Sequence, residues 1–127
     1  MRQGSLVDDI LTYTNQFRHA KNRSDLVIQE ELNALALQHS EDMAKGKVAF
    51  GHAGFEKREA QVFRTLHGAN SVAENVAMGA TTAQEVVKMW KNSPGHRENM
   101  LGAYKYIGIG VAANSKGVLY YTQIFSN

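Results

Sequence analysis

Two of the five histidines have neighbours that favour a chemical role for the imidazole ring. His52 and His96 each directly follow a glycine, in the tripeptides at 50–52 and 94–96. Small neighbours allow a side chain to face an open cavity, and imidazole changes its charge near neutral pH. The alternative is that each ring bonds a nearby backbone group and only shapes its loop, and the sequence leaves both interpretations open.

Glu74 is an acidic residue in an otherwise apolar setting, the segment 72–77 with the sequence VAENVA. A carboxylate in such a setting must pair with a cation or accept hydrogen bonds. Ser71 and Glu74 also fit the S-x-x-E pattern of a capping box, which predicts that a helix begins here. The two interpretations are compatible with each other.

The remaining three histidines are expected to be structural or solvated. His39 lies at helical spacing from the apolar residues around it, so we expect it to pack or to cap. His19 and His67 stand beside polar residues or glycine at the ends of predicted elements, which is typical of exposed side chains. These three are therefore weaker candidates than His52 and His96.

Ser93 and His96 have the residue types of a nucleophile and its base. However, serine directly before proline is a frequent helix start, with Ser93 as the N-cap and Pro94 in the first turn. Residues three apart at one helix start rarely reach attack geometry. A serine hydrolase is therefore disfavoured.

Apolar residues recur at helical spacing in several segments that would position these side chains. Ser5 with Asp8 and Thr82 with Glu85 fit capping boxes. The third helix is expected to direct Val62, Phe63 and Leu66 inward. The predicted helices cover 5–17, 29–45 with Gly46 as its end, 55–66, a segment that begins after Thr82, and 93–101.

Two apolar, β-branched runs at 106–113 and 118–125 predict a terminal hairpin around the turn at 114–117. A hairpin alone is too small to be stable, so at least one more strand should pair with it, supplied by 26–28 or 50–52. Helices followed by a hairpin predict an α+β layered domain.

Composition excludes several classes of protein. The length of 127 residues suits one domain, 1–127, with residues 1–5 expected to be an added or truncated start. The 14 Lys+Arg and 12 Asp+Glu leave a net charge of +2 without a basic stripe, which disfavours nucleic acid as a partner. The absence of cysteine excludes thiolate chemistry, and no apolar run reaches the ~20 residues of a transmembrane segment.

Six segments together resemble the CAP superfamily, which includes cysteine-rich secretory proteins, insect antigen 5, plant pathogenesis-related proteins and bacterial SCP-like domains. The resemblance covers the chain from about Leu6 to Phe125. The segments are ELNALALQHSEDMA at 31–44, GH at 51–52, AENVA at 73–77, VVKMWKNSPGHRENML at 86–101, YIGIGVA at 106–112 and YYTQIF at 120–125.

The resemblance implies an α-β-α sandwich with a central antiparallel sheet between helical layers, and a cleft that holds two histidines and two acidic residues. His52 and His96 match the cavity histidines, and Glu74 matches the glutamate of the E-N-[LIV]-A motif. At the fourth position, where eukaryotic members carry a glutamate, this chain has Ser93. Glu98 could compensate if its helix turned it inward, although a solvated Glu98 is favoured. The chain lacks the family's cysteines, as bacterial SCP-like domains do.

This ligand set of two imidazoles and one carboxylate, His52, His96 and Glu74, would accept a zinc ion or another divalent cation. If the carboxylate lay beyond bonding range, it would instead orient an imidazole. Three hypotheses follow: a secreted or cell-surface binding domain for a cation, small ligand or peptide; a metal-dependent hydrolase at the same site; and a non-catalytic extracellular scaffold for an unknown protein partner.

Overall fold

The computed structural model describes residues 3–127, so Met1 and Arg2 of the predicted start lie outside the described residues. Within this range the chain forms five helices and four strands. They are α1 (Gln3–Ala20), β1 (Val27–Ile28), α2 (Glu30–Ala44), α3 (Phe55–Thr65), β2 (Val72–Met78), α4 (Ala83–Lys91), α5 (Pro94–Met100), β3 (Tyr106–Ala113) and β4 (Leu119–Ser126).

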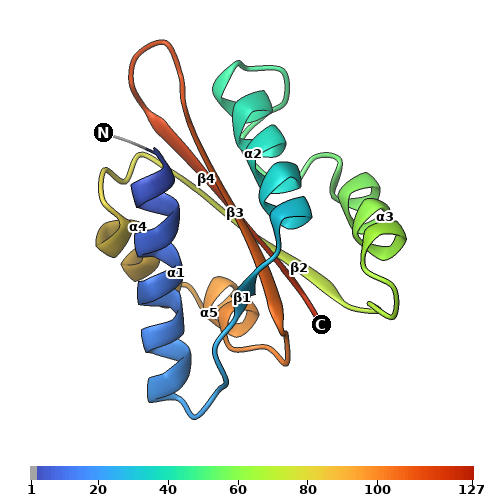
Figure 1. The fold of residues 1–127 in the computed structure, drawn as a ribbon. Coiled ribbons are helices and arrows are strands. Elements are labelled where there is room, and N and C mark those ends of the chain that lie inside the picture. The colour runs from blue at the N-terminus through green and yellow to red at the C-terminus, as the bar shows by residue number, and fades with distance from the viewer. Residues whose placement is uncertain (1–2) are drawn as a thin grey trace.

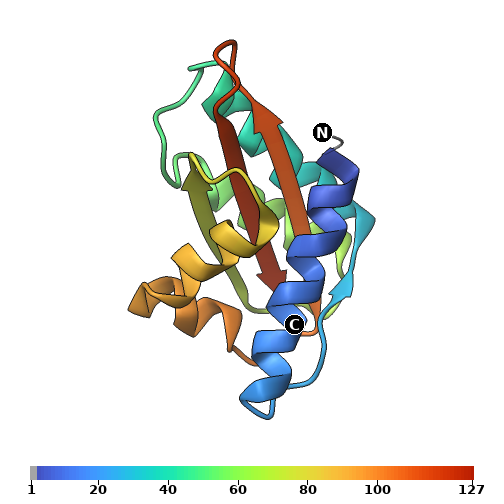
Figure 2. The same cartoon turned by 90° about the vertical axis from the view of Figure 1, so that its left-hand side faces the viewer.

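The strands form one sheet in the order β1-β3-β4-β2. Helices α2 and α3 lie on one face of this sheet, and α1, α4 and α5 lie on the other (Figure 1 and Figure 2). The expected α+β sandwich of two helical layers around a sheet is confirmed. The sheet is mixed rather than wholly antiparallel, because β1 pairs with β3 in parallel while β3 and β2 flank β4 antiparallel.

Of the two segments proposed as a further strand, the one at 26–28 joins the hairpin, as β1. The segment at 50–52 lies in the loop between α2 and α3. A strand that was not predicted, β2, completes the sheet beside β4. It occupies the position where Ser71 and Glu74 suggested a helix start, so that capping-box prediction is wrong. The run of apolar residues around Glu74 is better explained by a strand that is buried along four consecutive positions.

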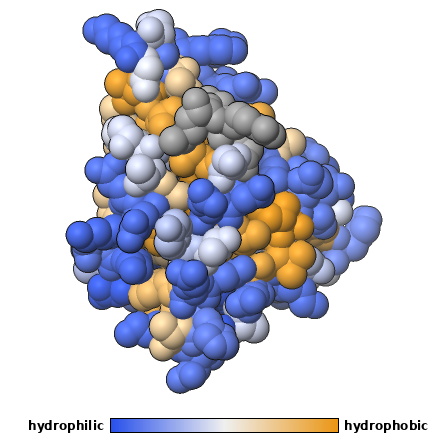
Figure 3. All heavy atoms as spheres, turned by 60° about the vertical axis from the view of Figure 1, so that its left-hand side comes forward, coloured by the Kyte–Doolittle hydropathy of each residue, from blue (hydrophilic) through white to orange (hydrophobic). Residues whose placement is uncertain are grey.

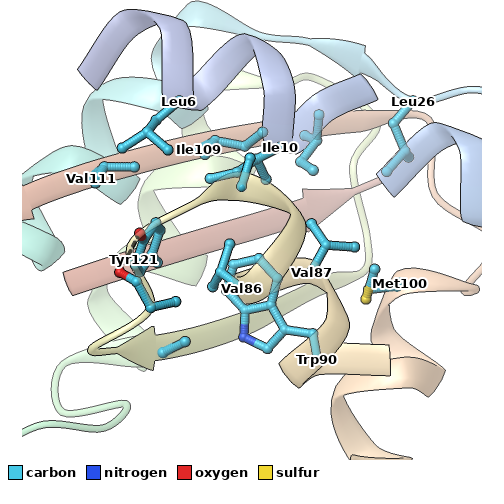
Figure 4. Packing of buried hydrophobic residues seen from close by; sticks show 14 of the residues in the cluster. Leu6, Ile10, Leu26, Val86, Val87, Trp90, Met100, Ile109, Val111 and Tyr121 are labelled. Atoms are coloured by element: carbon cyan, nitrogen blue, oxygen red, sulfur yellow. Dashed lines mark hydrogen bonds between the residues drawn. The ribbon is translucent and has the colours of Figure 1, made fainter. Parts of the chain in front are cut away.

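The larger core lies between the sheet and α1, α4 and α5. Figure 4 shows side chains of α1 and α4 meeting those of β3 and β4, with Trp90 and Tyr121 among the labelled residues. Trp90 also donates from Nε1 to the carbonyl of Val76 at 3.1 Å, which ties α4 to β2. Val86, Val87 and Trp90 on α4 are all buried and form its inward face.

Two helix predictions need correction. Helix α1 runs from Gln3 to Ala20, so Ser5 lies inside the helix and cannot be its N-cap. On α3, Val62 is buried but Phe63 is exposed, because Val62 packs against Leu32 and Ile124 in the smaller core and the next residue along the helix points away from it. The capping interaction at Thr82 is confirmed, since its side chain accepts from the backbone N–H of Glu85.

Hydrophilic side chains cover most of the face shown in Figure 3, with separate hydrophobic patches between them. Among residues 3–127, no helix has both the length and the apolar character that crossing a membrane would require.

Candidate functional site

Glu74 is placed by β2 on the sheet face that α2 and α3 cover, and its side chain is only 1% exposed. Its strand neighbour across the sheet is Ile124, which belongs to the smaller core with Leu32, Ala36 and Val62. A carboxylate at this depth needs strong hydrogen-bonding partners to offset the loss of water.

Two side chains supply those partners. Arg58, on α3, donates from Nε to Oε2 of Glu74 at 2.6 Å and from Nη2 to Oε1 at 2.8 Å. In the tautomer with a proton on Nδ1, His52 donates to the same Oε1 at 2.9 Å. The carboxylate is therefore held by a two-pronged guanidinium contact and by one imidazole.

His52 reaches this position from the loop between α2 and α3 and remains half exposed, with 50% of its side chain accessible. Buried His39 donates from Nε2 to the carbonyl of Gly51 at 2.7 Å, directly before His52. Arg58 donates to the carbonyl of Ala53 at 2.9 Å, directly after it. The backbone is thus held on both sides of His52, and Glu74 holds its ring through Nδ1 and not through Nε2.

His96 comes from α5 on the opposite face of the sheet and is partly buried. Asn75, next to Glu74 on β2, donates from Nδ2 to the backbone carbonyl of His96 at 3.2 Å. Burial lowers the pKa of His96, and the nearby charge of His52 lowers it further. The structure therefore brings His52, Glu74 and His96 around one strand, and we call these three residues the histidine–glutamate cluster.

The other two candidates, Ser93 and Glu98, do not add a second carboxylate to this cluster. Ser93 takes the N-cap position of α5, as predicted, but its side chain makes no capping hydrogen bond with the residues that the structure describes. Glu98 is exposed to solvent. The cluster thus contains one carboxylate.

Residues 3–127 contain no three His, Asp or Glu side chains arranged to hold a metal ion. Both oxygens of Glu74 already accept hydrogen bonds, from Arg58 and His52, so the carboxylate is engaged within the chain. The contact from His52 Nδ1 to a carboxylate is the arrangement that orients metal-binding histidines in proteins. The three-ligand zinc site stays a prediction.

Arg58 is a site residue that was not predicted from the sequence. A signal was present, because Phe55, Arg58 and Val62 follow the spacing of the buried stripe of α3. Burying an arginine or a glutamate without a partner of opposite charge costs free energy. An arginine on the inward stripe of a helix, together with a glutamate in an apolar segment, therefore indicates an ion pair between the two.

Buried His39 and partly buried His96 predict a pH dependence of stability. Burial lowers the pKa of His39 and of His96 below the ordinary value of 6.5. The unfolded chain then binds protons that the folded chain resists, so the free energy of unfolding falls as the pH drops through 6.5 towards the lowered pKa values. Above 6.5 this contribution to stability is fully present.

Urea denaturation at about pH 7.5 and about pH 5.5 measures this loss. His39→Gln should show a smaller loss than wild type, because glutamine does not titrate and its amide can still donate a hydrogen bond. His67→Gln, at an exposed position, is the matched control and should behave as wild type. An unchanged loss in His39→Gln would contradict the prediction.

Comparison with known proteins finds matches over nearly the whole chain. A model of the cysteine-rich secretory protein (CAP) family matches residues 11–125. The protein YkwD of Bacillus subtilis is 35% identical over 104 residues, which are 80% of this chain and 40% of that protein. The chain thus spans less than half the length of this relative.

Two solved structures show the same fold. An extracellular protein of Bacillus anthracis with an SCP domain is 26% identical, with a TM-score of 0.81 over 96% of this chain and 40% of that chain. An outer surface protein of Borrelia burgdorferi superposes with a TM-score of 0.82 over 100% of this chain and 96% of that chain. It is 17% identical, so this second match concerns the fold alone.

Proposed function

Since the chain belongs to the cysteine-rich secretory protein (CAP) family, we propose that it is a binding domain that acts outside the cell or at the cell surface. The similar Bacillus anthracis protein, which is described as extracellular, supports this location. The histidine–glutamate cluster is the proposed ligand site, and a small polar ligand or a peptide is the proposed class of ligand.

The observation that carries this proposal is the hydrogen bond from His52 Nδ1 to buried Glu74. It holds a half-exposed imidazole in one orientation, with Nε2 available to a ligand. Imidazole nitrogens can donate hydrogen bonds to, or accept them from, the amide and carboxyl groups of a peptide. The pre-set orientation lowers the entropy cost of binding.

A divalent cation is the second ligand that this contact favours, held by His52 Nε2 and by His96. When bound, the ion would polarise an oxygen of water or of a ligand. The chain's own contribution is to hold the rings: Glu74 orients one, and Asn75 anchors the backbone of the other. Because only two protein ligands are available, we expect weaker binding than at structural zinc sites, which have four.

Zinc titration by calorimetry tests the cluster. Wild type is expected to release heat, and the double variant His52→Ala/His96→Ala to lose it. His19→Ala/His67→Ala removes the same number of imidazoles from exposed positions and is the matched control, expected to bind as wild type. Identical heats in wild type and in the His52→Ala/His96→Ala variant would remove the cation from the proposal.

Hydrolysis at the same site is the second candidate function, favoured by the carboxylate-oriented imidazole of His52, an arrangement suited to a general base. A panel of peptides and esters tests it. Turnover that disappears with a chelator and in Glu74→Gln would support a metal-dependent hydrolase, and turnover that survives both would exclude one. If partner binding survives loss of the whole cluster, the scaffold hypothesis replaces both.

A further inference from the structure

The contact between Arg58 and Glu74 places a positive charge where a metal ion bound by Glu74 would have to lie. The guanidinium lies along both carboxylate oxygens, at 2.6 Å and 2.8 Å, and the side chains are 11% and 1% exposed. This parallel two-bond geometry is the strongest form of an arginine–carboxylate pair. A third bond from Nη1 to the carbonyl of Ala53 fixes the guanidinium in place.

A positive partner offsets the cost of burying a carboxylate, and a lone pair that accepts from the guanidinium cannot also bind a metal ion. Arg58 meets this requirement from within the chain. A divalent cation at Glu74 would have to displace the guanidinium, which would then lose its hydrogen bonds and remain close to the ion. Electrostatic repulsion and lost bonding both oppose this exchange.

We propose that Arg58 is an internal cation that takes the place of a metal ion at Glu74 and sets the cation affinity of the cluster. This inference rests on the proposed ligand role of the histidine–glutamate cluster. Without the guanidinium, Glu74 would be free to join His52 and His96, giving the two-imidazole and one-carboxylate set that zinc accepts. The identity of residue 58 would then decide between a weak site with two imidazole ligands and a tighter site with a third, carboxylate ligand.

Arg58→Met tests the proposal, because methionine keeps an apolar stem on the helix and removes the charge. Calorimetry is expected to show zinc binding at least about tenfold tighter than in wild type, the scale on which groups around a metal change affinity. Zinc should also raise the Tm of the variant more than that of wild type. Arg64→Met, at an exposed position on α3, is the matched control and should bind zinc as wild type does.

Arg58→Lys covers the case in which Arg58→Met does not fold. Lysine keeps the charge and loses the two-pronged contact. The zinc affinity of Arg58→Lys should therefore lie between that of wild type and that of a variant in which Glu74 has no cationic partner. A folded Arg58→Met variant, or failing that Arg58→Lys, with no gain in zinc affinity overturns the proposal. Folding of Arg58→Met only when zinc is added supports it.

Adding Glu74→Gln to the Arg58 variant separates this inference from the proposed function. The gain in affinity should disappear if Glu74 is the new ligand, and a gain that persists would contradict the role of Arg58. The His52→Ala/His96→Ala comparison in a wild-type background tests the ligand role independently, so either idea can fail while the other stands.

Discussion

Replacing Gly108 with alanine is expected to lower the free energy of unfolding by about 3 kcal/mol or more, the upper end of what overpacking costs. A Cβ atom at this position would overlap the backbone carbonyl of Leu32 in α2. Backbone atoms cannot rotate away as a side-chain end can, so helix and sheet would have to separate. Thermal unfolding followed by circular dichroism measures the effect.

Gly110, two residues further along β3, also lies close to α2, and a Cβ there would overlap the backbone of Ala36 and Leu37. Gly110→Ala should therefore be as harmful as Gly108→Ala. Gly95→Ala is the matched control, because a Cβ in α5 meets open space and alanine is the better helix former. A Gly108→Ala variant as stable as Gly95→Ala would show that α2 can shift at little cost.

Arg18→Met is expected to lower the free energy of unfolding by about 3 kcal/mol, through the loss of donors to buried carbonyls. The Arg18 side chain on α1 is 1% exposed. Its Nη1 donates to the carbonyls of Met100 at 2.8 Å and Gly102 at 2.9 Å, and its Nε donates to that of Ser24 at 2.8 Å. The side chain thereby joins the end of α1 to the segment after α5.

Urea denaturation measures this effect, with Arg23→Met as the matched control at an exposed arginine. Arg18→Lys should be nearly as destabilised as Arg18→Met, because an ammonium cannot match the fork of a guanidinium that serves several carbonyls. If the lysine variant is as stable as wild type, the charge rather than the hydrogen-bond geometry explains the burial of Arg18.

Local patterns predicted most of the helices and the terminal hairpin. Periodicity placed α2 and α3 within about two residues of their observed bounds, because the buried face of a helix repeats every three to four residues. The Ser93-Pro94 helix start placed α5 equally well. The β3 prediction at 106–113 is confirmed at both ends. β2 was missed, since an apolar run buried at consecutive positions has no alternation to distinguish it from a helix start.

The site residues divide in the same way. Unusual neighbours singled out His52, Glu74 and His96, and the structure brings them around β2. Their bonding could not be predicted, because Arg58 meets Glu74 from another element, 16 residues away in the chain. The same holds for Arg18, whose partner Met100 lies 82 residues away.

The order of amino acids alone therefore established the helical layers, the hairpin, the family resemblance and the three candidate side chains, because each depends on residue types and local spacing. The folded chain alone decided that Glu74 pairs with Arg58, that β1 runs parallel to β3 and that α2 approaches β3 at Gly108. These features arise where distant segments meet, and the free energy of such a contact depends on burial and geometry that neither segment specifies alone.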